Sequence, residues 1–397
     1  MKTPTLLEIL KAALYVGTVG YGGPAILATM KKVIVQQKKW ITDEEFLNAL
    51  SLAQILPGAT FFNMLGYIGY KLQGLRGGIL APFVFALPAT ASITILAWAY
   101  FTFGNLNFVH SIFMGLGAMV VALLINATMI MGKSIFPGTD RTSYKGIVIA
   151  ALSFLGIHFL RWNVVYIIVV SGVLGALFFY YGNALEPDKG PSDAGVEKDA
   201  PRTGGLQHFL ASALLVGGLA VVFWSVAETW TLFTTFGKIG LLAFGGGFTA
   251  VPLIQHVAVD GMRWLDPTAF RDGIAMGQIT PGPVLITATF IGYKVKGIVG
   301  AVAATLGIFT PPLVLMMLAV RVHAKIKELK IAKAIVKGFL SGFVGLLLSV
   351  VLQFGVQSLI DWRTWSILAV SVLYLWVWKK NVVWLILGTI GVSLLVF

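Results

Sequence analysis

Apolar runs recur along the chain and are separated by short polar loops. In the first half they lie at 78–101, 111–131, 146–160 and 162–182, and an uncharged run follows at 208–226. A transmembrane helix needs about 20 predominantly apolar residues, a length that all but the short run at 146–160 approach. The pattern therefore predicts an all-α polytopic membrane protein.

One polar stretch interrupts this pattern at 183–205 and holds five of the sixteen acidic residues. It is rich in Pro, Gly and charge, and such a composition cannot bury a core. We therefore expect a first repeat at 1–182, a solvated linker at 183–206, a linking transmembrane helix at 207–227 and a second repeat at 228–397.

The two halves carry the same short motifs in the same order, at an offset of 223–224 residues. The matched stretches are "GYGGP" and "AFGGG" at 20–24 and 243–247, "AQILPG" and "GQITPG" at 53–58 and 277–282, and "IGYKLQG" and "IGYKVKG" at 68–74 and 291–297. Chance similarity between apolar helices does not keep Gln, Pro and Gly-Tyr-Lys in register. The chain therefore contains an internal duplication.

The distribution of Lys and Arg between loops predicts that the repeats have opposite orientations. The loop at 103–110 has no Lys or Arg, whereas its counterpart at 321–337 has six. The next pair reverses, because 132–145 is basic and the region around Asp361 and Arg363 is balanced. Cytoplasmic loops are enriched in Lys and Arg. We therefore expect two inverted-topology repeats.

Inversion also constrains how the start of each half threads the bilayer. Four spans in the first half return the chain to its starting side, and the run at 208–226 supplies the additional crossing. The interrupted segments that begin each half are then re-entrant half-helices. The alternative has five spans per half, with the first broken helix spanning and the run at 208–226 peripheral. We prefer the first count, because an uncharged run of that length should span.

Each half contains two broken apolar segments, one interrupted by Gly-Gly and the other by Pro-Gly. Non-helical backbone at membrane depth is tolerated only where protein or a water-filled cavity satisfies it. Each break leaves a half-helix N-terminus with free N–H groups and a positive dipole end. Four such ends brought together predict an anion site built mainly from backbone.

The candidate substrate-binding residues are the break residues and nearby polar side chains, namely Gly22, Gly23, Pro24, Gln54, Pro57, Gly58, Thr60, Asn63, Lys238, Gly245, Gly246, Gly247, Thr249, Gln278, Thr280, Pro281, Gly282 and Pro283. The candidate residues also have structural interpretations that involve no substrate binding. The glycines of any single break can be packing notches, and the two Gln side chains can simply satisfy freed backbone groups. Lys238 can extend to the membrane interface. Arg271 is interpreted as an interfacial anchor.

Composition excludes several function classes. Hydrophobic residues make up 57% of the chain and charged residues 11%, against about 25% charged in soluble domains. There is no cysteine, and no nucleotide-binding, catalytic or metal-ligand motif appears. We expect no enzyme activity, no catalytic residue, no cofactor and no metal. The net charge of +13 is assigned to cytoplasmic loops rather than to nucleic-acid binding.

At the broken segments the sequence resembles the chromate ion transporter family in its long, two-domain form. The resemblance rests on "GYGGP" and "AFGGGF", each with a Trp about 20 residues later, then on "AQILPGA", "GQITPGP" and "GYK". It implies a multi-pass transporter of the cell inner (plasma) membrane that exports chromate, a tetrahedral oxyanion, and gives chromate resistance.

Three departures from the family pattern bear on the substrate: Tyr21 stands where Phe is usual, Ala59 stands where Pro is common, and no His follows the first Gly-Gly-Pro. Transport of sulfate or another anion is therefore the first alternative, and a non-transporting membrane enzyme is a weaker one. The expected partners are the oxyanion and the lipid bilayer, and a homodimer is left open. If protons drive transport, Glu8, Glu228 and Asp260 are the first carboxylates to test.

Overall fold

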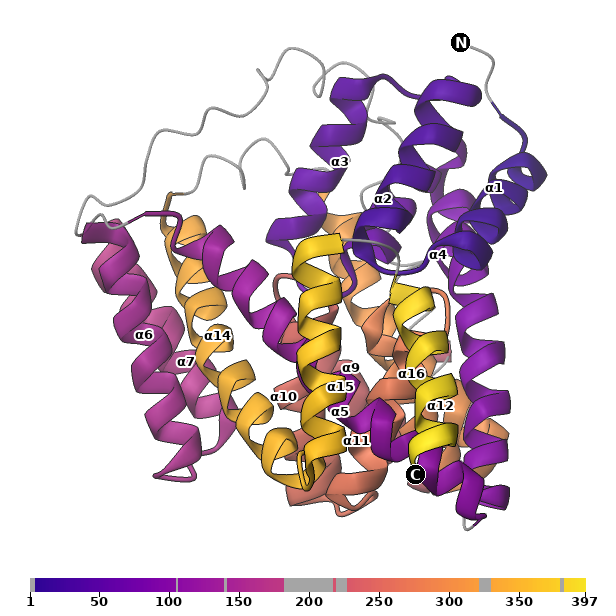
Figure 1. Ribbon diagram of the computed structural model, residues 1–397. Coiled ribbons are helices and arrows are strands. Elements are labelled where there is room, and N and C mark those ends of the chain that lie inside the picture. The colour runs from indigo at the N-terminus through magenta and orange to yellow at the C-terminus, as the bar shows by residue number, and fades with distance from the viewer. Residues whose placement is uncertain are drawn as a thin grey trace. The chain divides into compact units, whose positions relative to one another are not determined.

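The computed structural model describes residues 4–104, 106–138, 141–181, 217–218, 227–320, 330–378 and 382–397. The predicted linker at 183–206, and all of the predicted linking helix at 207–227 except 217–218 and 227, lie outside these residues. Within them the chain is helical and forms no strand (Figure 1). An isolated bridge joins the backbones of Tyr21 and Gly282. The prediction of an all-α polytopic membrane protein is confirmed.

The first half contains α1 (Leu6–Val19), α2 (Gly23–Met30), η1 (Lys31–Gln37), α3 (Asp43–Ile55), α4 (Thr60–Phe103), α5 (Asn107–Ile135), α6 (Arg141–His158), α7 (Val164–Gly175) and η2 (Ala176–Tyr180). The second half contains α9 (Ala227–Leu242), η3 (Gly247–Thr249), α10 (Ala250–Gln255), η4 (His256–Gly261), α11 (Pro267–Ile279), η5 (Val284–Ile286), α12 (Thr287–Ala319), α14 (Lys330–Ser358), α15 (Trp362–Leu373), η6 (Tyr374–Trp378) and α16 (Val382–Val396).

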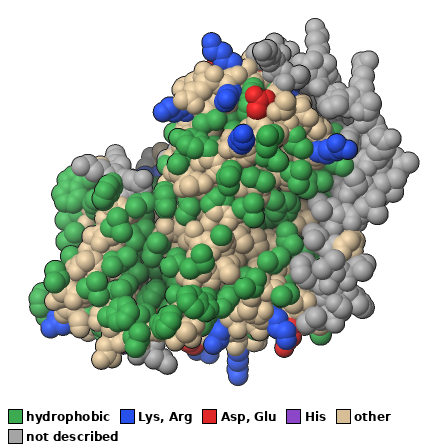
Figure 2. All heavy atoms as spheres, turned by 90° about the vertical axis from the view of Figure 1, so that its right-hand side faces the viewer, with side chains coloured by type: hydrophobic (Ala, Val, Ile, Leu, Met, Phe, Trp, Pro, Cys, Tyr) green, Lys and Arg blue, Asp and Glu red, His purple; other side chains and the backbone are tan. Residues whose placement is uncertain are grey.

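Four helical segments among the described residues are long and apolar enough to cross a bilayer, namely Thr60–Phe103, Asn107–Ile135, Val284–Ala319 and Lys330–Ser358. Figure 2 shows hydrophobic side chains spread over one face, with Lys and Arg toward its upper and lower ends. On α4, large apolar side chains such as Leu87 and Ile95 are exposed. An exposed apolar surface of this kind is expected where a helix faces lipid.

Helices α4 and α12 each consist of two arms joined at a sharp reversal. In α4 the helix is interrupted at Gln73 and Gly74, and in α12 at Lys296 and Gly297. Just before and after the reversal in α4, the backbones at Gly69 and Gly77 touch, and the same holds for Gly292 and Gly300 in α12. Residues eight apart in a straight helix would be separated by about 12 Å. The arms therefore fold back on each other.

The arms differ in length in a way that bears on the membrane. The first arm of α4 covers residues 60–72, which is about 20 Å of helix, whereas the second covers 75–103, or about 43 Å. The hydrocarbon core is about 30 Å thick. The first arm alone is too short to cross it. Whether the first broken segment of each half, α1 with α2 or α9 with α10, is re-entrant or spanning stays a prediction.

Matched backbone features make the duplication visible. Lys39 and Arg263, which lie 224 residues apart, both have a φ of 52°. The reversals at Gly74 and Gly297 have φ values of 61° and 57°. A π-helical stretch follows α2 in the first half and α10 in the second. The relative orientation of the two repeats stays a prediction.

The chain forms two compact units, and each draws on both halves. The first unit comprises the described residues of 1–95, 187–250 and 280–329, and the second those of 96–186, 251–279 and 330–397. The segment 251–279 therefore belongs to the second unit, whereas its repeat counterpart at about 28–55 belongs to the first.

Small residues allow close helix packing inside each unit. In the first unit Gly17 touches the backbone of Phe85, and the equivalent Gly240 touches that of Ile308. In the second unit α6 and α7 run beside α14 (Figure 1), where Gly345 meets the backbone of Ala150. Glycine at such crossings lets two helix backbones approach closely, as is common in membrane proteins.

Candidate functional site: four converging helix breaks

Four breaks in the helices lie in the first unit. Two are Gly-Gly breaks, at 20–22 between α1 and α2 and at 243–246 between α9 and η3. Two are Pro-Gly breaks, at 56–59 between α3 and α4 and at 280–283 between α11 and η5. They coincide with the interruptions predicted from the sequence.

Each Pro-Gly break is hydrogen-bonded to the Gly-Gly break of the other half. The N–H of Gly282 donates to the carbonyl of Gly20 at 3.1 Å, and the N–H of Gly58 donates to the carbonyl of Ala243 at 2.7 Å. Gly20 corresponds to Ala243 in the repeat, and Gly58 to Gly282. The two hydrogen bonds are therefore equivalent, and we call them the crossed pairs.

The two breaks of the same half also lie side by side. A Cβ placed on Gly23 would come within 3.3 Å of the Phe61 ring, and one placed on Gly247 within 2.9 Å of Val284. Together with the crossed pairs, these contacts gather all four breaks into one cluster. Both halves contribute backbone to it, as the sequence predicted.

Glycine is required at the centre of both Pro-Gly breaks. Gly58 has a φ of 100° and Gly282 one of 121°, a region that side chains rarely adopt. A Cβ on Gly282 would lie 2.8 Å from that of Ala89, and a Cβ on Gly58 would collide with Pro312. Ala89 and Pro312 are themselves repeat equivalents. Each Pro-Gly break is thus wedged against the long second arm of the other half.

Three of the helices that follow the breaks start without a side-chain cap. α2, η3 and η5 begin after Gly22, Gly246 and Pro283, and no side chain caps them. By contrast, α1 and α3 begin with complete capping boxes at Thr5 and Thr42. The first N–H groups of a helix have no acceptor within it. The uncapped ends therefore present donors to whatever occupies the cluster. (α5 also starts without a cap, but at an exposed position.)

Two of the predicted polar ligands brace the breaks instead of extending from them. Asn63 is fully buried, and its Nδ2 donates to the carbonyl of Pro57 at 2.8 Å. Thr249 Oγ1 donates to the carbonyl of Gly246 at 2.6 Å. Asn63 Oδ1 has no hydrogen-bond partner among the described residues. These side chains therefore hold the break carbonyls in place, which helps to orient the N–H groups.

The remaining predicted residues are distributed unevenly. The buried ones are Pro57, Thr280, Pro281 and Pro283. The half-buried ones are Thr60, Gly23, Gly246 and Gly247, and the exposed ones are Gly22, Gly245, Gln54 and Lys238. Pro24 is the second residue of α2. Gln278 lies in the last turn of α11, and its Nε2 has no partner among the described residues. Exposure of Lys238 on α9 agrees with a lysine that extends to an interface.

An ion pair braces the start of α3. Lys71, from the first "GYK" motif, lies 2.5 Å from Glu45 Oε1. Burial by itself would raise the pKa of Glu45, but the hydrogen bonds from Lys71 and from the Thr42 backbone outweigh it and hold the pKa below its usual value. Glu45 therefore stays ionised and ties α3 to the first arm of α4.

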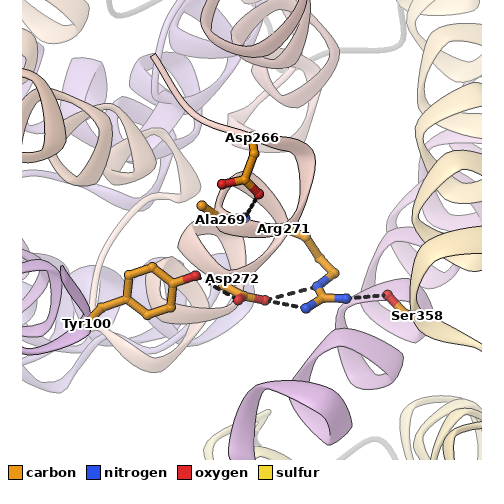
Figure 3. Close-up of polar contacts among 6 residues, drawn as sticks. All are labelled: Tyr100, Asp266, Ala269, Arg271, Asp272 and Ser358. Atoms are coloured by element: carbon orange, nitrogen blue, oxygen red, sulfur yellow. Dashed lines mark hydrogen bonds and ion pairs between the residues drawn. The ribbon is translucent and has the colours of Figure 1, made fainter. Parts of the chain in front are cut away.

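The interpretation of Arg271 as an interfacial anchor is wrong. Arg271 and Asp272 are only 7% and 3% exposed, and they form an ion pair inside the second unit (Figure 3). Nε and Nη2 of Arg271 donate to Oδ1 of Asp272 at 2.9 and 2.7 Å, and Nη1 donates to Ser358 at 3.2 Å. The hydroxyl of Tyr100 donates to Oδ2 of Asp272 at 2.9 Å. Neighbours at i and i+1 do not normally face each other on a helix, so their adjacency in the sequence does not predict that they pair.

The carboxylates singled out from the sequence are exposed. Glu8 closes the capping box of α1. Glu228 pairs with Lys296 at 2.6 Å, and Asp260 lies 3.7 Å from His256. Across the described part of the chain, no three His, Cys, Asp or Glu side chains gather as a metal site would require.

Comparison with known proteins shows which sequences resemble the chain over most of its length. The profile of the family described as chromate transporter matches residues 7–176 and 230–394. An uncharacterized transporter of Methanocaldococcus jannaschii is 32% identical over 95% of this chain and 90% of the relative. A chromate transport protein of Cupriavidus metallidurans is 30% identical over the same shares. An uncharacterized transporter of Bacillus subtilis is 26% identical over 45% of this chain, yet 90% of that relative is covered. No solved structure matches.

Proposed function

Since the chain belongs to the chromate transporter family, we propose that it is a secondary transporter that exports chromate from the cytoplasm across the cell inner membrane and so gives resistance to chromate. The family is one of transporters rather than enzymes, which removes the membrane-enzyme alternative.

The observation that carries the proposal is the cluster of four breaks, three of which are followed by a helix that starts without a side-chain cap. Chromate is a tetrahedral dianion. A set of N–H groups that approach from two halves of the chain suits such a shape, because donors reach it from more than one direction. Helix N-termini also place positive partial charge near the anion without burying a full cation. The crossed pairs hold the ends together before any anion arrives.

We propose that alternating access uses the points at which the chain passes between its two units. The chain leaves the first unit between Ala250 and Val251 and re-enters it between Ile279 and Thr280. Both points adjoin second-half breaks. Motion of one unit against the other would therefore act on the backbone of the cluster. We place the repeats in opposite orientations on the strength of the Lys and Arg distribution.

The membrane potential supplies a driving force for export. Moving one charge across 100 mV is worth about 2.3 kcal/mol, so a dianion leaving a negative interior gains roughly 4–5 kcal/mol. No nucleotide-binding motif is present. We therefore propose electrogenic export that needs no nucleotide.

Sulfate is the second candidate substrate, because it is a tetrahedral dianion like chromate. Tyr21, one of the residues that depart from the family pattern, pairs through its backbone with Gly282 in the cluster. A change at that position can therefore alter the substrate that the cluster accepts. Competition between the two anions tests this directly. If sulfate does not slow chromate flux and is not itself transported, sulfate is excluded as a substrate.

The experiment uses the purified full chain in liposomes with labelled chromate and an imposed potassium-diffusion potential. We expect flux that changes with the potential and reverses its response when the sign of the potential is reversed. Empty liposomes and liposomes at zero potential are the controls. Flux that ignores the potential and follows the pH gradient alone would contradict electrogenic export, and absence of flux for both anions would contradict the proposed function.

A further inference from the structure

The lysines of two packed helices in the second unit lie at one end of their bundle. α5, α6, α7, η2 and α14 contain no Asp or Glu, and α14 packs against the other four. Lys145 lies in the second turn of α6, whereas Lys330, Lys333 and Lys337 occupy the first turns of α14. The stretches that lead into these two helices are the basic ones at 132–145 and 321–337, which the sequence predicts to be cytoplasmic.

Contacts with η2 bring the starts of α6 and α14 to the same place. Lys145 Nζ donates to the carbonyl of Phe178 at 2.8 Å, and the ammonium of Lys337 lies 5.0 Å from the centre of the Phe179 ring. Phe179 is fully buried and packs with buried residues of α6 and α14. Both lysine-bearing helix starts therefore converge on the end of η2.

These lysines are held against the protein instead of extending fully into water. Lys145, Lys333 and Lys337 are all half-buried, and we call them the lysine cluster. Lys333 and Lys337 are four residues apart and so share one face of α14. A lysine that only marks one side of a membrane extends its charge into water. The helix dipole at the end of η2 amounts to about half a negative charge, which is less than three ammonium groups carry.

An exposed apolar stripe runs from the lysine cluster along α6. Lys145, Val148 and Leu152 follow the i, i+3, i+7 spacing of one helix face, and Val148 and Leu152 are 45% and 50% exposed. Tyr144 and Tyr181, at the same end, are also exposed. Tyr is enriched where a membrane meets water. Positive charge, interfacial aromatic rings and apolar surface therefore follow one another along this edge of the second unit.

The duplicated fold does not require the lysine cluster. α14 is the repeat equivalent of α5, and the positions equivalent to its three lysines hold Asn107, His110 and Met114. The start of α5 thus occupies the same place in its own repeat without a lysine. The lysines are an addition to the second repeat, which favours a role in binding over one in folding.

We propose that the lysine cluster binds the phosphate of an anionic phospholipid, whose acyl chains lie along the apolar stripe of α6. An ammonium group has three N–H donors, and the contact of Lys145 with Phe178 uses one of them. Charge-assisted hydrogen bonds to phosphate are stronger than neutral ones. Basic pockets between membrane helices on the cytoplasmic side suit anionic headgroups. Inorganic phosphate offers the same oxygens but has nothing to place on Val148 and Leu152, so the stripe favours a lipid.

The measurement uses the purified full chain in detergent. It compares phosphatidylglycerol, an anionic lipid, with zwitterionic phosphatidylcholine of the same acyl chains. Native mass spectrometry counts the lipid molecules that stay bound, and the thermal unfolding midpoint measures the stabilisation that binding gives. We expect the native chain to retain phosphatidylglycerol in preference to phosphatidylcholine and to unfold at a higher temperature in its presence.

The variant that tests the cluster combines Lys145→Gln, Lys333→Gln and Lys337→Gln. It should bind phosphatidylglycerol at least about tenfold more weakly, because each lysine near a headgroup adds to the attraction. Arginine at the same three positions keeps the charge and should keep the preference. Should the glutamine variant fail to fold, Lys333→Gln with Lys337→Gln leaves the contact between Lys145 and Phe178 in place and should still weaken binding.

The matched control removes three exposed lysines of the first unit, by Lys11→Gln, Lys32→Gln and Lys38→Gln. It changes the net charge by the same amount and should bind phosphatidylglycerol like the native chain. Equal retention of phosphatidylglycerol by the control and the cluster variant would overturn the proposal.

Two further outcomes would also overturn it. Inorganic phosphate that stabilises the native chain as much as phosphatidylglycerol at the same concentration would show that the cluster needs no lipid. Lipid binding that appears only after the five acidic residues of 183–205 are neutralised would show that the lysines pair with the linker instead. None of these measurements depends on chromate flux, so the proposed function stands or falls separately.

Discussion

At the scale of single residues, the most constrained positions are Gly58 and Gly282. Each combines a positive φ with a neighbour from the other half that leaves no room for a side chain. The sequence indicated these glycines through the duplicated Pro-Gly motif. It could not indicate that Ala89 and Pro312 would be the atoms pressed against them, because that contact depends on how the arms of α4 and α12 fold back.

Gly282→Leu should abolish chromate flux. The change forces a side chain into a conformation that costs about 1–2 kcal/mol and against Ala89, and it displaces the N–H that bonds to Gly20. Gly246→Leu, where nothing lies within 4 Å, should block the cluster without such a collision. The measurement is flux per folded protein, with Gly388→Leu of α16, also in open space, as the control. Normal flux in both break variants would mean that these glycines serve helix packing and are not needed for transport.

Side-chain direction is the part of the site that the sequence could not predict. Asn63 and Thr249 were chosen as ligands because they are polar and adjoin a break, yet their donors turn back to Pro57 and Gly246. Arg271 flanks the second-half broken segment in the sequence, a position at which a charged residue is expected to be an interfacial anchor. Its burial follows from the neighbouring carboxylate and from the space left by Gly117.

At the scale of elements, the sequence predicted broken helices but not the reversals inside α4 and α12. The "GYK" stretches were recognised as a repeated motif, and 78–101 as a separate span. The sequence feature that could have indicated the reversals is a pair of glycines eight residues apart with a further glycine between them. The pairs are Gly69 with Gly77 and Gly292 with Gly300. Only the tertiary contact explains that spacing, since glycine inside a helix otherwise has no local benefit.

Gly300→Val should destabilise the protein by about 1–3 kcal/mol, because a side chain there meets the backbone of Gly292 and forces the two arms apart. Thermal unfolding of the detergent-solubilised protein measures the loss as a lower midpoint. Gly391→Val in α16 is the control, since open space surrounds that position. Equal midpoints for the two variants would mean that the arms do not need their close approach.

At the scale of the whole molecule, hydropathy alone was enough to predict a helical membrane protein. It was not enough to predict that the compact units would cut across the repeats. The assignment of 251–279 to the second unit depends on Gln255, Phe270 and Arg271 finding partners on α14. Such pairings join residues roughly 85–100 positions apart, and no periodicity in the sequence reports them.

Opposite orientation of the repeats predicts opposite sides for two equivalent loops. A single cysteine at Phe108 should react with an impermeant thiol reagent added to the periplasmic side of intact cells or spheroplasts. One at Ile331, in the strongly basic stretch 321–337, should react only after the membrane is opened. Equal reaction of both cysteines from outside would rule out the inverted arrangement.

The crossed pairs also carry an evolutionary consequence. Because the Gly-Gly break of one repeat is hydrogen-bonded to the Pro-Gly break of the other, a lone ancestral repeat could complete this arrangement only by associating with a second copy. In a chain that carries both repeats, a substitution in either break also removes a hydrogen-bond partner from the other repeat. The breaks of the two repeats are therefore expected to change together, whereas the segment at 251–279, which carries Arg271 and Asp272 where the first repeat has Leu47 and Asn48, can differ from its counterpart.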